Sequence, residues 1–152
     1  FNVDAASTLP CGAGGRGRSW GRQVSLVALS LDVDERGGEV TITMQGGDGK
    51  WFGVGFGASS MGDLPYAIIV DGFGAVTERK LADHGPGRLL PATLRVVSTA
   101  VQGGNRTVVL KRAVKGATPD YFTFAAGQTS LPFINAIGGT PGFGQHVARA
   151  PS

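Results

Sequence analysis

Short segments of alternating apolar and polar residues, closed off by glycine-rich turns, constrain this chain more than any other feature. In the segment EVTITM, the apolar residues Val40, Ile42 and Met44 alternate with polar ones. A period of two places one set on the buried face of a β-strand, so Met44 is expected in a core. The chain contains 26 Gly and 8 Pro, which interrupt helices and favour tight turns. We therefore predict an all-β fold.

The same criterion predicts further strands along the chain and a single domain. They are expected at residues 24–31, 51–57, 65–71, 75–81, 93–102, 106–111, 120–126 and 131–137. Residues 82–92 read as a loop, and residues 1–22, which lack periodicity, as an irregular N-terminal arm. Many short strands with closely spaced turns favour an antiparallel sandwich or barrel, here one domain over residues 23–152.

Charge and composition exclude several classes of partner. The net charge is +3, and the basic residues are not interleaved with aromatic ones, so we expect no nucleic-acid partner. The longest apolar runs, such as Ala67–Val70, are too short for a membrane span. Because the chain begins at Phe1 without a signal segment, it reads as a mature or excised piece of a longer polypeptide.

Two single features bear on location and modification. Cys11 is the only cysteine, so no internal disulfide can form, and the thiol is either free or paired with another chain or segment. Asn105-Arg106-Thr107 is an acceptor sequon for N-glycosylation in an expected hairpin turn, and it matters only if the chain is secreted.

The expected strand at 51–57 has one face made almost entirely of glycine. Phe52, Val54 and Phe56 share one side, whereas Trp51 and three glycines share the other. Glycine inside a strand often marks the close approach of another backbone or of a ligand. Tight packing against a loop and room for a planar ligand explain this flat face equally well, and the residues leave both open.

The order of these segments resembles the DOMON domain over residues 24–150. The resemblance lies in an aromatic-Gly-Val-Gly-Phe strand, Met-Gly-Asp after a Ser-rich turn, an apolar strand ending in Asp, Thr-Val-Val-Leu-Lys-Arg, Ile-Asn-Ala-Ile-Gly, and Gly-Gln-His near the end. This family includes the cytochrome domain of cellobiose dehydrogenase and extracellular domains attached to transmembrane b-type cytochromes. It implies a two-sheet antiparallel immunoglobulin-like β-sandwich in an extracellular setting. The single cysteine departs from the pair that family members often carry.

The resemblance also implies a cofactor, haem b, with its iron held between two axial ligands. The family's Met after the Gly-Phe strand matches Met61, and its His near the C-terminus matches His146; His84 is the fallback second ligand. A Met/His pair suits electron transfer, because it leaves no open position for substrate. The implied partners are a fused dehydrogenase, a transmembrane b-type cytochrome or a small reductant.

Two functions from different classes follow. The first is a non-catalytic electron-transfer domain, part of a larger oxidoreductase, that binds one b-type haem through Met61 and His146. The alternative is a haem-free extracellular sandwich that binds glycans or assembly partners. Hydrolytic chemistry is not favoured, because Gly-x-Ser-x-Gly is absent and the aspartates are scattered.

Overall fold

The computed structural model describes most of the chain. It places residues 7–12, 17–23, 27–34, 36–57, 65–82, 85–124 and 130–143, and for 7–12, 17–23, 85–86 and 130–132 the backbone alone. None of these residues is helical. Within them no helix is long and apolar enough to cross a membrane.

Eleven strands lie within the described residues, and every pairing between them is antiparallel. They are β1 (Ser7–Gly12), β2 (Gly17–Gln23), β3 (Ala28–Asp34), β4 (Glu39–Gly47), β5 (Phe52–Phe56), β6 (Tyr66–Val70), β7 (Val76–Ala82), β8 (Gly85–Leu90), β9 (Arg95–Gln102), β10 (Asn105–Ala113) and β11 (Ser130–Ile137).

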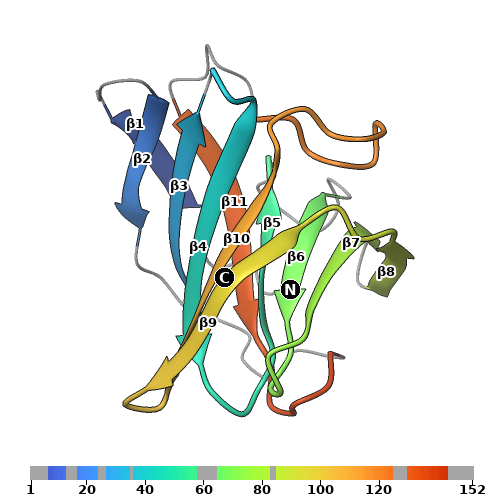
Figure 1. Ribbon diagram of the computed structural model, residues 1–152. Coiled ribbons are helices and arrows are strands. Elements are labelled where there is room, and N and C mark those ends of the chain that lie inside the picture. Colours follow the sequence, from blue (N-terminus) through green and yellow to red (C-terminus); the bar gives the residue numbers. More distant parts are fainter. Residues whose placement is uncertain are drawn as a thin grey trace.

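The strands form two sheets that share β1. Sheet A has the order β8-β7-β6-β5-β11-β1, and sheet B continues as β1-β2-β3-β4-β10-β9. Ser7–Pro10 of β1 pair with β11, whereas Cys11 and Gly12 pair with β2, so this strand passes from one sheet to the other. Figure 1 shows the two layers facing each other. The predicted all-β, two-sheet antiparallel sandwich is confirmed.

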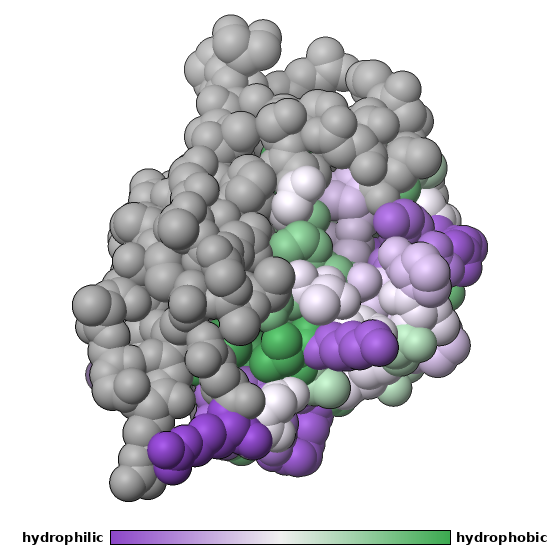
Figure 2. Space-filling view, turned by 90° about the horizontal axis from the view of Figure 1, so that it is seen from above, coloured by the Kyte–Doolittle hydropathy of each residue, from purple (hydrophilic) through white to green (hydrophobic). Residues whose placement is uncertain are grey.

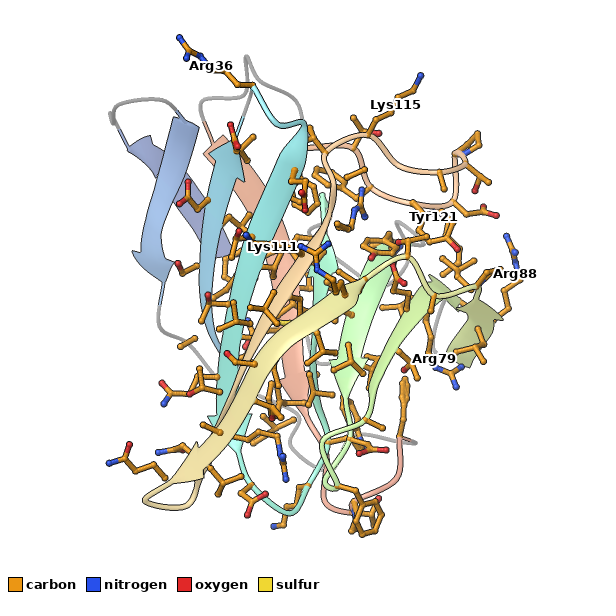
Figure 3. All side chains as sticks on the ribbon, viewed as in Figure 1. Arg36, Arg79, Arg88, Lys111, Lys115 and Tyr121 are labelled. Carbon is orange, nitrogen blue, oxygen red and sulfur yellow. The ribbon has the colours of Figure 1, made fainter. Side chains whose placement is uncertain are left out.

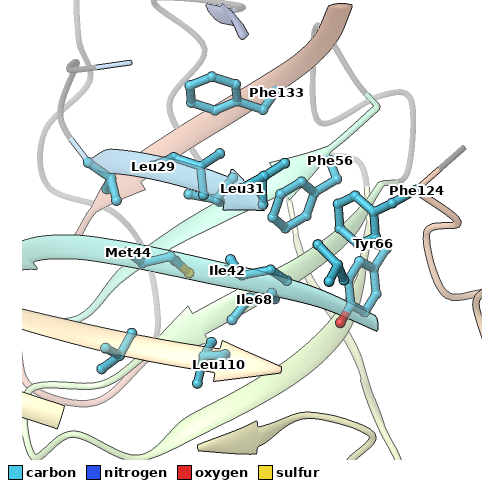
Figure 4. Close-up of a cluster of buried hydrophobic side chains, with 14 of the residues drawn as sticks. Leu29, Leu31, Ile42, Met44, Phe56, Tyr66, Ile68, Leu110, Phe124 and Phe133 are labelled. Carbon is cyan, nitrogen blue, oxygen red and sulfur yellow. The ribbon is translucent and has the colours of Figure 1, made fainter. Parts of the chain in front are cut away.

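The main core fills the space between the sheets. Sheet B contributes the alternating apolar residues of β3, β4 and β10, including Leu31, Ile42 and Leu110, and sheet A those of β5, β6 and β11. Figure 4 shows these side chains meeting between the layers. Met44 is fully buried here, as its place in the alternation predicts. Seen from above, apolar surface is confined to small areas among polar side chains in the described part (Figure 2).

Three segments differ from the sequence-based expectation. The expected irregular arm contains β1 and β2, and the expected loop at 82–92 contains β8. Each of these three strands contains Gly or Pro and lacks an alternation of apolar and polar residues. Backbone pairing to a neighbouring strand holds each of them in place, and such pairing leaves no periodic pattern in the sequence. Conversely, Asp120–Phe124 form no strand although their residues alternate.

A two-residue turn joins β9 to β10. Gly103 and Gly104 have φ of 60° and 79°, the left-handed region that a tight hairpin turn demands at both central positions. The adjoining residues Gln102 and Asn105 are directly paired, so the turn consists of Gly103 and Gly104 alone.

A pair of substitutions in β4 tests the assigned faces. Ile42→Ala should lower the free energy of unfolding by about 2–5 kcal/mol, because it removes a fully buried side chain between the sheets. Thr43→Ala, on the opposite face, should cost less than about 1 kcal/mol. Urea denaturation measures both, and equal losses would contradict the assignment.

Candidate functional site

The predicted ligands Met61 and His146, and the fallback His84, all lie outside the described residues. Residues that flank two of them are described. β5 and β6, which the Met61 segment joins along the chain, are neighbouring strands of sheet A. Phe143, three residues before His146, packs against the outer face of the same sheet. The described surroundings of the Met61 and His146 segments therefore lie on sheet A.

The outer face of sheet A carries small residues at its centre. One row of directly paired residues across four strands is Ile134, Gly55, Ala67 and Arg79, and the next is Ala136, Gly53, Ile69 and Thr77. At a spacing of about 4.8 Å, four strands span about 14 Å. We call Gly53, Gly55, Ala67, Ile69, Ile134 and Ala136 the small-residue floor.

Aromatic side chains lie at one edge of the small-residue floor. The rings of Trp51 and Phe143 are 4.8 Å apart, and the guanidinium of Arg79 lies 4.8 Å from the centre of the Phe143 ring. Figure 3 shows Arg79 projecting from β7. At the β5–β6 end, a Cβ on Gly55 would stand 3.1 Å from the ring of Pro65, so this proline approaches the floor closely.

The small-residue floor is buried, not open. Its alanines and isoleucines are at most 1% exposed, and both glycines are buried. The first of the two explanations for the glycine face, close packing, is therefore observed. A ligand could bind to this face only by displacing some of the residues that now cover it. The floor bears no acid, base or nucleophile, so its chemistry is that of an apolar wall beside one cation, suited to binding and not to hydrolysis.

A second buried cluster lies between the sheets, and the sequence analysis missed it. The Glu78 side chain, 2% exposed, accepts hydrogen bonds from Tyr66 Oη (2.6 Å) and from Thr93 Oγ1 (2.5 Å). Its other oxygen accepts the backbone N–H groups of Thr93 (2.5 Å) and Leu94 (3.2 Å). In the sequence Glu78 sits between Thr77 and Arg79 in a polar run, which carries no signal of burial.

Arg112 completes this cluster from sheet B. It is 4% exposed, donates to the backbone oxygens of Ala113 (2.9 Å) and Phe122, and lies about 5 Å from the rings of Tyr66 and Phe124. The cluster therefore joins β10 of sheet B to β6 of sheet A. Because the Glu78 oxygens are fully engaged with the chain itself, we assign the cluster a structural role.

Both tyrosines of the chain lie at this cluster and resist ionisation. Burial raises the pKa of Tyr66 well above its ordinary value; Arg112 opposes this rise and Glu78 adds to it. Burial and then Glu78 likewise raise the pKa of Tyr121, whose Oη donates to the Pro91 carbonyl at 2.5 Å. The phenol of Tyr66 therefore stays protonated in the folded state well past the pH at which free tyrosine ionises, and the pKa of Tyr121 is shifted in the same direction.

The comparisons with known proteins leave the family resemblance as a prediction. No protein-family model matches the sequence, and a search of curated proteins finds no significant match. Among the described residues, no three His, Cys, Asp or Glu side chains are grouped to hold a metal ion. A Met/His pair would not form such a group, so the haem prediction is untouched by this result.

The raised tyrosine pKa values predict a loss of stability in alkali. Unfolded tyrosine ionises at about pH 10, whereas the folded phenols remain neutral, so stability is complete below that pH and falls above it. The contribution of Tyr66 to the slope should approach about 1.4 kcal/mol per pH unit, and Tyr121 should add to it in the same direction. Tyr66→Phe should remove the contribution of Tyr66 to this slope. Urea unfolding at a series of pH values from about 9 to 11 measures the slope.

An exposed tyrosine supplies the control. Phe73 is 80% exposed, so Phe73→Tyr should add phenolate absorbance near the ordinary pKa while the protein remains folded. Tyr66 should give no phenolate absorbance until the fold is lost, and Tyr121 should ionise only above the ordinary pKa of tyrosine. Early ionisation of the wild-type tyrosines, or an unchanged slope in Tyr66→Phe, would contradict their burial at the Glu78 cluster.

Proposed function

We propose that this chain is an electron-transfer domain that binds one b-type haem through Met61 and His146. The observation that supports this most is the small-residue floor and what borders it. Pro65, which follows the Met61 segment, and Phe143, which precedes His146, both approach the outer face of sheet A. The described residues nearest to the two predicted ligands along the chain therefore lie on the same face, although Met61 and His146 are 85 positions apart in the sequence (146 − 61).

The described residues fit a haem. A macrocycle needs an apolar wall, and Gly53, Gly55 and Ala67 supply one beside the side chain of Ile134, which lies 2.9 Å from where a Gly55 Cβ would stand. Trp51 and Phe143 offer aromatic surface at its edge. The positive charge of Arg79 lies beside that edge and suits a propionate group. Met61 and His146 would hold the iron, and their thioether and imidazole are established axial ligand types.

The chain's own residues would set what the domain can do. When bound, a haem held by Met61 and His146 would exchange single electrons and would offer no open position for substrate. The thioether of Met61, as a ligand, would raise the reduction potential of the iron, and the apolar floor would keep water away. The floor carries no group that accepts or donates protons, which fits electron transfer without acid–base catalysis.

The resemblance that motivates this proposal also places the domain outside the cytoplasm and within a larger oxidoreductase. Its redox partner would be a fused dehydrogenase, a transmembrane b-type cytochrome or a small reductant. The domain itself would be non-catalytic and would pass electrons between such partners.

A haem-free interaction module is the second candidate, and one observation favours it. Phe73 is 80% exposed at the tip of the β6–β7 turn. Asp71 holds that turn by accepting the backbone N–H groups of Phe73 and Ala75, each at 2.9 Å. A rigidly presented aromatic ring is typical of the anchor residues of protein interfaces.

Absorption spectra of ligand variants test the haem proposal. The purified domain, offered haem and then reduced with dithionite, should show a Soret band and sharp α and β bands. Met61→Ala and His146→Ala should each abolish the low-spin six-coordinate spectrum, because each removes one axial ligand. His84→Ala is the matched control and should leave the spectrum unchanged.

Two results would contradict the assignment. A domain that stays colourless after haem addition would exclude the cytochrome function and favour the interaction module. Loss of the spectrum in His84→Ala but not in His146→Ala would make His84 the second ligand.

Bulk added to the small-residue floor tests where the haem lies. Ala67→Leu should weaken haem binding about tenfold or more, since overfilling a packed surface costs about 1–3 kcal/mol. Ala113→Leu, the same change at an exposed position of sheet B, should leave affinity unchanged. Haem titration measures the affinity, and urea unfolding without haem confirms that both variants fold. Unchanged affinity in a folded Ala67→Leu variant would place the haem elsewhere.

A further inference from the structure

Of the three asparagines in the chain, Asn105 alone stands in an acceptor sequon for N-linked glycosylation, followed by Arg106 and Thr107. It is exposed, whereas Asn135 is 2% exposed and its Oδ1 accepts the backbone N–H of Val27. An acceptor asparagine must present its side-chain amide to an enzyme at the surface, and Asn105 meets that requirement.

The surroundings of Asn105 leave space for a bulky group. It is the first residue of β10, directly after the Gly103-Gly104 turn and beside Gly47 of β4. A Cβ added at any of these three glycines would meet no atom within 4 Å. The alternation of β10 buries Val108 and Leu110, so Asn105 and Thr107 belong to the opposite, outer face of sheet B.

A hollow begins one residue pair further along this outer face. It has a volume of about 270 Å³, and its lining combines the hydroxyl groups of Ser30, Thr43 and Thr107 and the amide of Gln45 with the apolar residues Ala28 and Leu29. Hydroxyl and amide groups are suitable hydrogen-bonding partners for sugar hydroxyls. A sugar attached at Asn105 would thus find open space and polar groups immediately beside it.

The neighbouring edge strand β9 has only limited protection of the kind usual at a sheet edge. All eight of its residues are exposed, and Val96, Val97 and Val101 are about half exposed (49%, 50% and 48%). Arg95 is its single charged residue, and the break in register near Val97 is its one irregularity. A long exposed apolar edge pairs readily with another chain unless something covers it.

We propose that Asn105 carries an N-linked glycan that lies beside the hollow at Thr107 and shields the exposed edge of β9. Asn105 is paired directly with Gln102, the last residue of that edge strand, so the glycan would be attached one strand away from the edge. Opposite residues of a pair stand about 5 Å apart, well within the reach of an oligosaccharide. This inference rests on the proposed extracytoplasmic location and is independent of haem binding.

The modification is a group transfer in the secretory pathway. The side-chain amide nitrogen of Asn105 bonds to the anomeric carbon of an oligosaccharide carried on a lipid pyrophosphate. The bond between that carbon and the pyrophosphate oxygen breaks, the lipid pyrophosphate leaves, and the proton lost by the amide passes to the released pyrophosphate. The hydroxyl of Thr107 is the part of the sequon that the transferase requires besides the asparagine.

Four versions of the full chain test the site when expressed behind a secretion leader in a eukaryotic host. They are the wild type, Thr107→Ser, Thr107→Val and Asn105→Gln. Mass spectrometry of protein from both medium and cells should find the glycan in the first two and its complete loss in the last two. Thr107→Val is the sharpest control, because it retains Asn105 and the branched side chain of the strand.

Unmodified Asn105 in the wild-type protein would overturn the proposal. Because the leader routes the chain into the secretory pathway, this outcome would count against the site and not against the native location. A colourless but glycosylated protein would count against the haem alone.

Shielding is tested on the same material. After enzymatic release of the glycan from folded protein, sedimentation should shift from monomer to larger species, and Val101→Lys should reverse that shift by placing a charge on the edge. Identical sedimentation before and after release would overturn the shielding role while leaving the modified site in place.

Discussion

The burial of the central strands β5 and β6 of sheet A on both faces is the constraint from which the rest of the molecule follows. Every residue of β5 and β6 is buried. A strand that is buried on both sides must fill the main core with the side chains of one face. The residues of its other face must be small enough for neighbouring parts of the chain to approach the backbone closely. The sequence of β5 satisfies both demands by alternating Phe52, Val54 and Phe56 with Gly53 and Gly55.

The polar cluster between the sheets shows how the fold tolerates charge in its interior. An unpaired buried carboxyl group or guanidinium would cost several kcal/mol. Here four donors surround Glu78, and Arg112 is held by two backbone oxygens and two aromatic rings. Since Arg112 belongs to β10 and Tyr66 to β6, their contact fixes one sheet relative to the other. A purely apolar core would lack this directional restraint.

What the sequence could predict depended on whether local alternation determines a strand. The strands around Ile42, Val54 and Val108 were predicted because their faces differ in polarity, and the buried Met44 followed from the same pattern. β1, β2 and β8 were missed because pairing with a neighbour holds them, and such pairing is not encoded locally. Glu78 was missed for a related reason: its donors, at Tyr66 and Thr93, are 12 and 15 residues away. The glycine face was predicted as a site of close approach, but only the structure reveals that β6 and β11 extend it with alanine and isoleucine.

The two outer faces of the sandwich suit different roles for a single physical reason. Sheet A presents an apolar surface that water cannot solvate well, so it must be covered by the chain or by a cofactor. Sheet B presents hydroxyl and charged groups such as Thr43 and Lys111, which water or a sugar can satisfy. A haem is therefore expected to compete for the first face, and a glycan to extend over the second. Because the main core separates the two faces, each can be altered without disturbing the other.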